Sequence, residues 1–252
     1  MNSPSLPRQF ALDIGHTPKP SFSNFLAGEN LALHSTLQAI AKSWEMNAPR
    51  LDSENPLNQR WIYWWGPEGS GRSHLLGAIG NAAQQLDLEY FPLTPHEPIS
   101  WVSLEESLPA LCSSVTPSVI TVDDVDRLDE RLVASLFRIL NAIQGSEAMH
   151  IFMAGNAAPA VLRLREDLRT RLGWGLIFQT HLLGDGEKIE ALQQAAQARG
   201  LVLSPDVLPW LLNRFYRDMP NLMALIDALD AYSLETKRAV TLPLVRELLQ
   251  PK

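Results

Sequence analysis

The sequence predicts an α/β protein in which a parallel sheet lies between two layers of helices, followed by a small all-helical unit. Short apolar segments, each long enough for one buried strand, alternate with segments of helical period over residues 61–181. A glycine-rich turn directly follows the first of these strands. After residue 184 only the helical period remains. These three observations together define the expected three-layer α/β/α domain and its helical appendage.

The composition is that of a globular protein from a reducing compartment. With 252 residues, 46% of them hydrophobic, the chain can build one large α/β domain and a smaller one. The net charge is −7 and no basic block is present, which argues against autonomous nucleic-acid binding. Cys112 is the single cysteine, so the chain cannot form an internal disulfide. Because no apolar run reaches membrane-spanning length and no signal peptide is apparent, we expect a cytoplasmic protein without membrane contacts.

The N-terminal head, residues 1–20, is rich in proline and serine, and we expect it to be flexible. It contains a polar anchor followed by spaced apolar side chains: Gln9, Phe10, Leu12 and Ile14. This is the form of a short linear motif that docks into an apolar pocket of a partner. An N-terminal arm that packs on its own domain would use the same residues. The expected division is a flexible segment over 1–20, an α/β domain over 21–182 and a helical domain over 183–252.

The first strand, 61–65, follows an amphipathic helix from residue 31 and a polar loop over 47–58. It leads into a turn with the spacing G-x-x-x-x-G-[K/R]-S of a phosphate-binding P-loop, and a helical pattern follows at once. Glycines let backbone N–H groups turn inward, and the positive end of the helix points at the anion. The predicted nucleotide-binding residues are Gly66, Pro67, Glu68, Gly69, Ser70, Gly71, Arg72, Ser73 and His74. Ser73 is also placed to reach a magnesium ion.

Arg72 departs from the motif, because a lysine is usual at this position. A guanidinium group binds phosphate well but is larger and planar, so it does not replace lysine at a catalytic phosphate contact. We therefore expect nucleotide binding to persist and intrinsic hydrolysis to be weak. The alternative is a glycine-rich turn that only ends a strand, which the flanking strand and helix disfavour.

Two aspartates end a later strand. After a helix over 75–86, a strand over 88–93 and a short helix over 104–111, the apolar segment from Val119 ends in Asp123 and Asp124. At the carboxyl edge of a sheet beside a P-loop, the first carboxylate can bind magnesium, directly or through water. The second, Asp124, is a further candidate magnesium ligand and can orient an attacking water. The alternative for each aspartate is an ordinary solvated strand end.

The next strand, after a helix over 132–143, ends at Asn156, where a γ-phosphate or an attacking water would be sensed. A single asparagine after a strand is also a common turn residue. Residues 162–172 are rich in arginine, and on a helix such a run is ordinarily a solvated face. Its arginines are Arg163, Arg165, Arg169 and Arg171.

The remaining elements are a fifth strand over 176–181 and the helices of a small lid. Pro205 suits the first turn of the second lid helix, whereas Pro209 costs a hydrogen bond and would delay the start of that helix. The lid helices are expected over residues 187–199, 204–217, 221–237 and 242–250.

The order of P-loop, paired aspartates, strand-end asparagine, arginine-rich segment and helical lid resembles an AAA+ ATPase. The run Asp167-Leu-Arg-Thr-Arg171-Leu-Gly-Trp-Gly175 is similar to the arginine-finger box of the bacterial replication initiator DnaA. Residues 22–30 are similar to the DnaA segment that covers the adenine, which implies nucleotide contacts for Phe22 and Phe25. The helix-turn-helix DNA-binding domain that DnaA carries is expected to be missing. With the N-terminal motif and the arginine in the P-loop, the sequence over residues 9–250 resembles the Hda family of DnaA-related regulatory inactivators.

Membership of this family would give the ambiguous segments specific roles. The head becomes a ligand of the β sliding clamp, although Phe10, Asp13 and Ile14 replace the Leu, Pro and Leu of the family motif. Arg171 becomes an arginine finger aimed at a nucleotide on a neighbouring subunit. The lid arginine of the family falls at Pro220, one helical turn after Arg217, and this loss also favours slow intrinsic hydrolysis.

The resemblance implies a negative regulator of replication initiation. Bound to ADP (or ATP) with Mg²⁺ and docked on the DNA-loaded clamp, the chain would present Arg171 to ATP on DnaA. Its partners would be the β sliding clamp and DnaA, with DNA reached only through the clamp, and a homo-oligomer is compatible with such a module. Two alternatives are a self-sufficient ATPase, such as a helicase-loader-like AAA+ protein, and an adaptor of clamp and DnaA without a catalytic arginine.

Overall fold

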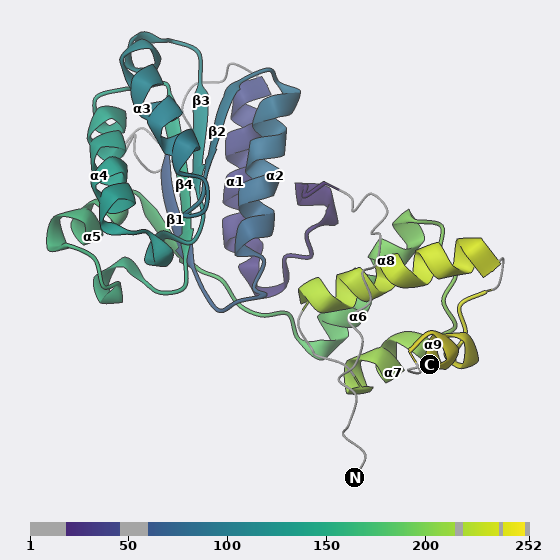
Figure 1. The fold of residues 1–252 in the computed structure, drawn as a ribbon. Coiled ribbons are helices and arrows are strands. Elements are labelled where there is room, and N and C mark those ends of the chain that lie inside the picture. Colours follow the sequence, from purple (N-terminus) through teal and green to yellow (C-terminus); the bar gives the residue numbers. More distant parts are fainter. Residues whose placement is uncertain (1–18, 46–59, 215–218, 237–238, 250–252) are drawn as a thin grey trace. The chain divides into compact units, whose positions relative to one another are not determined.

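The computed structural model of the chain describes residues 19–45, 60–214, 219–236 and 239–249. Two compact units are present, an α/β unit over Lys19–Leu182 and a helical unit that includes Leu183–Lys252. Figure 1 shows the sheet and its helices in the first unit and only helices in the second. The predicted head motif, residues 9–14, and Arg217 lie outside the described residues.

The α/β unit is built on a parallel five-stranded sheet with the strand order β2-β3-β4-β1-β5. The strand β1, between β4 and β5, pairs with β4 from Trp61↔Ile151 to Trp65↔Gly155, so both strands end at the same edge. The predicted parallel α/β architecture is therefore confirmed. The strands are β1 (Trp61–Trp65), β2 (Glu89–Leu93), β3 (Ser118–Val122), β4 (Met149–Gly155) and β5 (Leu176–Gln179).

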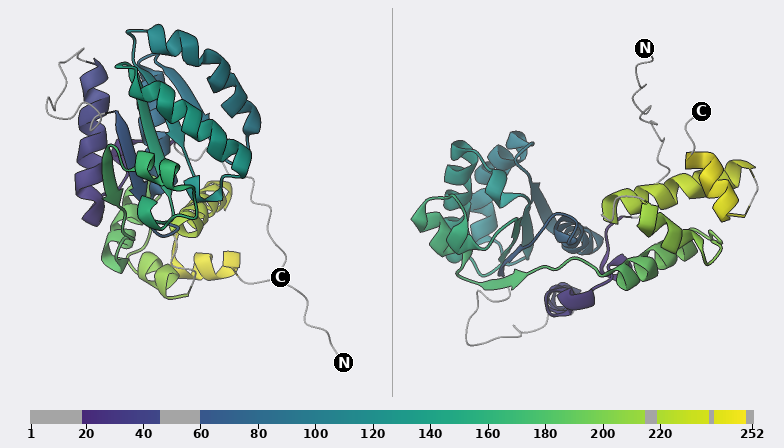
Figure 2. Two further views of the ribbon diagram at one scale, coloured as in Figure 1. Left: turned by 90° about the vertical axis from the view of Figure 1, so that its left-hand side faces the viewer. Right: turned by 90° about the horizontal axis from the view of Figure 1, so that it is seen from below.

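Helices cover both faces of this sheet (Figure 1; Figure 2, left). In β1, Ile62 and Trp64 pack with the α1 and α2 core, whereas Trp61 and Tyr63 pack with the α3, α4 and α5 core. Successive strand residues point to opposite faces, so a strand between two helical layers is apolar throughout. The helices are α1 (Leu31–Glu45), α2 (Arg72–Gln85), α3 (Pro98–Ser113), α4 (Glu130–Gln144) and α5 (Glu166–Leu172).

Both ends of α4 are held by side chains. Asp129 is its N-cap and accepts hydrogen bonds from the backbone N–H groups of Arg131 and Leu132. At the other end the buried guanidinium of Arg60 donates to the carbonyls of Ile143 and Ser146. A cation at the negative end of a helix is favourable, and these acceptors explain how an arginine can be buried there.

Two predicted helices differ from the observed ones. The short helix expected over 104–111 spans Pro98–Ser113, because proline needs no N–H at the first helical position and begins the helix earlier. The helix expected over 204–217 begins at Val207 and its described part ends at Arg214. Its late start agrees with the effect expected from Pro209.

The helical unit has a core of its own, and the predicted lid is confirmed as all-helical. Leu211, Leu229 and Leu244 are fully buried in it. Arg199 and Asp227 form an ion pair at 2.5 Å with side chains only 10% and 8% exposed. In the residues that the structure describes, no helix is both long and apolar enough to cross a membrane. The helices are α6 (Asp185–Ala198), α7 (Val207–Arg214), α8 (Met219–Thr236) and α9 (Leu242–Leu249).

Candidate nucleotide-binding site and arginine segment

The glycine-rich turn after β1 has the closed conformation that a P-loop requires. The Gly66 N–H donates to the Gly155 carbonyl at 3.3 Å, which ties the turn to the end of β4. Gly69 and Gly71 have φ of +82° and +86°, values that side chains rarely allow. Ser70 is buried, and its hydroxyl lies 2.8 Å from that of Thr180 after β5. The turn is therefore held in place at the ends of three strands, β1, β4 and β5.

Helix α2 begins directly after this turn, at Arg72, with Gly71 as its N-cap. No side chain of this cap accepts a hydrogen bond from the first-turn N–H groups. Free N–H groups and the helix dipole together favour an anion at this end. The sequence-predicted residues from Gly66 to His74 are thus brought together in the geometry of a phosphate site.

The guanidinium of Arg72 points toward the paired aspartates. Its Nη2 lies 3.9 Å from Asp124 Oδ1, and the side chain is only 10% exposed. Its Nη1 is buried without a hydrogen-bond partner in the described residues. A buried donor without an acceptor costs about 1–3 kcal/mol, so an incoming phosphate oxygen would relieve this cost.

The two aspartates differ in environment. Asp123 Oδ1 accepts the Asp124 N–H at 2.9 Å. Asp124 has φ of +48° and also faces Arg127 at 3.4 Å. Burial and then the neighbouring Asp123 carboxylate raise the pKa of Asp124 above its usual value. The side chains of Ser73 and Asp123 offer the hydroxyl and carboxylate oxygens that Mg²⁺ prefers. Asp124, by contrast, already faces two guanidinium groups, so it is the less available oxygen donor.

The strand end at Asn156 is supported by two residues that sequence reasoning missed. Asp126 Oδ1 accepts the Asn156 N–H at 2.8 Å. The Tyr63 hydroxyl donates to the Ala157 carbonyl at 2.7 Å, and burial raises the pKa of Tyr63, which keeps the hydroxyl protonated. Asn156 itself is exposed. Asp126 follows the paired aspartates closely and could have been noticed, whereas nothing local distinguishes Tyr63 within an aromatic strand.

The segment predicted to cover the adenine lies against the P-loop. A Cβ on Gly71 would fall 2.5 Å from Phe25 Cε2, so the Phe25 ring packs directly on that glycine. The Phe25 ring lies 5.5 Å from the rings of both His34 and His74. His74 Nε2 is 3.1 Å from the Ser21 carbonyl, and burial lowers the pKa of His74.

Phe22 is held in the same segment, because its carbonyl lies 3.0 Å from His34 Nε2. Sequence reasoning did not identify His34. Asn30, at the end of the segment, exchanges hydrogen bonds with the backbone of His181 at 3.0 and 2.7 Å. Both predicted aromatic residues are therefore fixed beside the phosphate turn.

The arginines of residues 162–172 have different surroundings. Arg165 is 64% exposed, pairs with Asp167 at 2.5 Å, and its guanidinium carbon lies 5.5 Å from the centroid of the Phe137 ring. Arg169 Nη1 donates to the Ala160 carbonyl at 3.1 Å. The Arg171 guanidinium lies over the rings of Phe137 and Trp174. Helix α5 carries Arg171 on the sheet face opposite to α2 (Figure 1).

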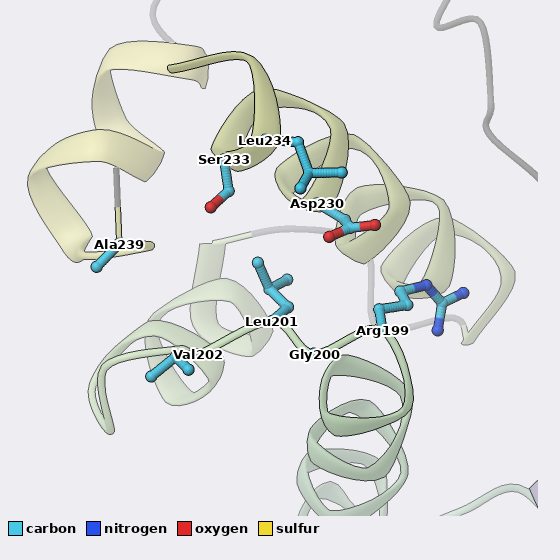
Figure 3. A pocket seen from close by; sticks show the side chains of 8 residues that line it. All are labelled: Arg199, Gly200, Leu201, Val202, Asp230, Ser233, Leu234 and Ala239. Carbon is cyan, nitrogen blue, oxygen red and sulfur yellow. The ribbon is translucent and has the colours of Figure 1, made fainter. Parts of the chain in front are cut away.

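The helical unit contains a shallow pocket of about 360 Å³ (Figure 3). Two apolar side chains at its rim, Val202 and Leu234, are 76% and 71% exposed. None of the predicted nucleotide-binding residues lines it. The pocket is lined by Arg199, Gly200, Leu201, Val202, Asp230, Ser233, Leu234 and Ala239.

Pro220, to which the resemblance assigns the position of the family's lid arginine, is the second residue of α8.

Comparisons with known proteins point in one direction. Residues 185–249 match the family model described as "Hda, lid domain". An uncharacterised protein of Haemophilus influenzae is 31% identical over 247 residues, which cover 96% of this chain and 98% of that protein. Domain III of the Thermotoga maritima replication initiation protein DnaA has a similar structure, with a TM-score of 0.69 at 20% identity, covering 92% of this chain and 98% of that one.

AMPPCP-bound DnaA from Aquifex aeolicus is also similar, with a TM-score of 0.66 at 23% identity over 87% of this chain and 67% of that one. At these identities the structural likeness concerns the fold. It confirms the predicted combination of a P-loop α/β domain and a helical lid.

Proposed function

The chain belongs to the Hda family of DnaA-related AAA+ proteins, and from this premise we propose that it is a negative regulator of replication initiation. Docked on the DNA-loaded β sliding clamp, it promotes hydrolysis of ATP bound to DnaA by supplying Arg171 in trans. The observation that carries this proposal is that Arg171 and the P-loop helix α2 lie on opposite faces of the sheet. Helix α5 therefore holds Arg171 on the face away from the P-loop helix of its own chain, which supports a target on another molecule.

The nucleotide bound by the chain itself is ADP, with Mg²⁺ held by Ser73 and Asp123. Support comes from the positive φ of Gly69 and Gly71, the uncapped start of α2 and the unpartnered Nη1 of Arg72. A DnaA structure of the same fold contains the ATP analogue AMPPCP. When bound, Mg²⁺ supplies charge neutralisation to the phosphate oxygens. Phe25, packed on Gly71, presents an aromatic face near the phosphate turn.

The chain should hydrolyse ATP slowly on its own. Arg72 replaces the lysine that usually contacts the β- and γ-phosphates, and Pro220 stands where the family has its lid arginine. Both residues that would stabilise charge on the transferring phosphoryl group are thus altered. A nucleotide-loaded regulator that acts on a second ATPase fits these substitutions better than an independent motor does.

Partner contacts are assigned to the head and to the finger segment. Gln9, Phe10, Leu12 and Ile14 bind the sliding clamp, and DNA is reached through the clamp. DnaA is met by the α5 face that carries Arg171. The protein is cytoplasmic in this proposal, and homo-oligomers remain compatible with it.

The decisive experiment measures hydrolysis of DnaA-bound ATP with clamp, DNA and this protein added separately and together. Arg171→Ala should abolish the stimulation while clamp association persists, because a finger acts only on charge that develops in the transition state. Fingers supplied in trans are worth on the order of 10³–10⁵ in rate. Arg165→Ala is the matched control, since Arg165 is exposed and paired with Asp167, and it should change little.

The same experiment separates the alternatives. Loss of stimulation with Arg169→Ala but not with Arg171→Ala would move the finger by two positions and leave the mechanism intact. Full stimulation by both variants would make the protein a non-catalytic adaptor. Brisk ATP turnover by the isolated protein would instead favour a self-sufficient ATPase.

A further inference from the structure

We propose that Phe137 and Trp174 are positioning residues that store Arg171 in a withdrawn orientation, from which docking must release it. We call this pair of rings the aromatic sandwich. The inference rests on the proposed role of Arg171 and concerns how that role is controlled. In the free protein the Arg171 guanidinium is thus held over two rings, with its Nη1 buried.

The aromatic sandwich is formed by two separate elements. The guanidinium carbon of Arg171 lies 4.0 Å from the centroid of the Phe137 ring, which α4 contributes. It lies 4.9 Å from the Trp174 ring, just after α5. Trp174 in turn contacts the fully buried Trp61 of β1, with ring centroids 5.6 Å apart. One wall of the sandwich is therefore anchored on strand β1 of the sheet.

The hydrogen-bonding state of Arg171 supports the assignment of this orientation as a withdrawn one. Its Nη1 is buried and has no hydrogen-bond partner within the described residues. An arginine finger works by donating N–H groups to phosphoryl oxygens, so a covered donor contributes nothing. Rotation of the side chain out of the sandwich would expose this nitrogen to a phosphate.

The restraint on Arg171 is also of a releasable kind. In the described part of the chain no salt bridge to Arg171 is found, whereas Arg165 has Asp167 as a carboxylate partner. Cation–π stacking is weaker than a hydrogen-bonded pair with a phosphate and has no fixed direction. A phosphate on the partner can therefore draw Arg171 away from the rings. A guanidinium that the rings did not hold would bind that phosphate more readily.

A stored finger has a measurable consequence. When only a fraction of molecules has the finger released, the apparent affinity for the finger-engaged complex is reduced by that fraction. Weakening the aromatic sandwich should therefore improve engagement without lowering the rate at saturation. A rigid support that pre-orients the finger would behave in the opposite way.

The test uses the full chain with clamp, DNA and ATP-loaded DnaA, and it measures hydrolysis as this protein is titrated. Phe137→Leu removes the aromatic face but stays apolar. The half-saturating concentration should fall about two- to tenfold, with the saturating rate equal or higher. Phe137→Tyr keeps the ring and should match the parent chain. Trp174→Leu provides a second variant if Phe137→Leu does not fold, as judged by ADP binding and circular dichroism.

Three results would overturn the inference. Phe137→Leu and Trp174→Leu could lower the saturating rate as Arg171→Ala does, or leave the titration curve unchanged. A double-mutant cycle on urea unfolding could also show no coupling between Phe137→Leu and Arg171→Ala, which would mean that the sandwich does not form in solution. Undiminished stimulation by Arg171→Ala would instead contradict the proposed function itself, so the two failures are distinguishable.

Discussion

At the scale of single residues, the nucleotide site depends on positions where a side chain has no room. Gly71 combines a φ of +86° with direct contact to the Phe25 ring. It therefore links the phosphate turn to the segment expected to cover the adenine. A Cβ there would strain the backbone and displace the ring at once.

We expect Gly71→Ala to weaken ADP binding by at least about tenfold, since about 1.4 kcal/mol suffices for that factor. Isothermal titration of ADP measures the effect. Gly186→Ala is the matched control, because a Cβ there meets nothing within 4 Å. Parent-like ADP affinity in Gly71→Ala would mean that Phe25 and the turn do not act together.

Arg72 is the second informative residue. In the free chain its guanidinium lies between the turn and Asp124, at 3.9 Å from that carboxylate. A lysine would present a compact charge, whereas the planar guanidinium reaches the aspartate pair without a metal. This contact gives Arg72 a carboxylate partner within the site.

At the scale of elements, helix α4 connects the segment that carries Arg171 to helix α3. It carries Phe137 of the aromatic sandwich on one side and contacts α3 on the other. Glu105 of α3 forms the bridge, accepting hydrogen bonds from Arg138 at 2.6 Å and from Ser135. Burial tends to raise the pKa of Glu105, but these hydrogen bonds outweigh it and bring the pKa below its usual 4.5.

This bridge predicts a pH-dependent contribution to stability. A carboxyl group whose pKa is lowered on folding stabilises the protein above its unfolded-state pKa and loses this contribution as pH falls through the folded-state pKa. Glu105→Gln should therefore lower the free energy of unfolding at neutral pH by about 0.5–1 kcal/mol, a small value because Arg138 is 56% exposed. The difference from the parent chain should shrink as pH falls below 4.5 and through the lowered pKa of Glu105.

Urea unfolding at several pH values provides the measurement. Glu106→Gln, an exposed glutamate on the same helix, is the control and should show no such dependence. An equal effect of Glu105→Gln at acidic and neutral pH would assign the loss to packing and not to charge.

At the scale of the whole molecule, the proposed functions of nucleotide binding, catalysis in trans and partner docking fall in separate parts of the chain. The P-loop and the finger lie on opposite faces of one sheet. The helical unit has its own core, and the head motif precedes both units. A partner of the finger can therefore approach without competing for the chain's own nucleotide.

The head should be separable from the two units in function. Changing Gln9→Ala together with Phe10→Ala removes the polar anchor and the first apolar anchor, so clamp affinity should fall about 30-fold or more. ADP affinity and thermal stability should stay at parent values. A clamp titration with Ser5→Ala as control measures this, and unchanged clamp affinity would return the segment to the role of an arm on its own domain.

The sequence by itself determined the features that depend on local pattern. The strand before the P-loop, the glycines of the turn, the aspartates after β3 and the lid helices all follow from periodicity, from backbone conformation or from strand-end position. The larger extent of α3 was underestimated, although Pro98 carried the signal for its start. Each of these features is decided within a few neighbouring residues.

Only the tertiary structure decided which distant side chains meet. Asp126 and Tyr63 hold the backbone beside Asn156, and Phe137 reaches Arg171 from another helix. These contacts depend on strand order, on register and on the packing of α4 against α5, none of which a local pattern contains. The resemblance of the arginine-rich segment could be recognised in the sequence. Whether Arg171 points outward or lies over the rings of Phe137 and Trp174 depended on how the helices pack, because packing places the rings beside it.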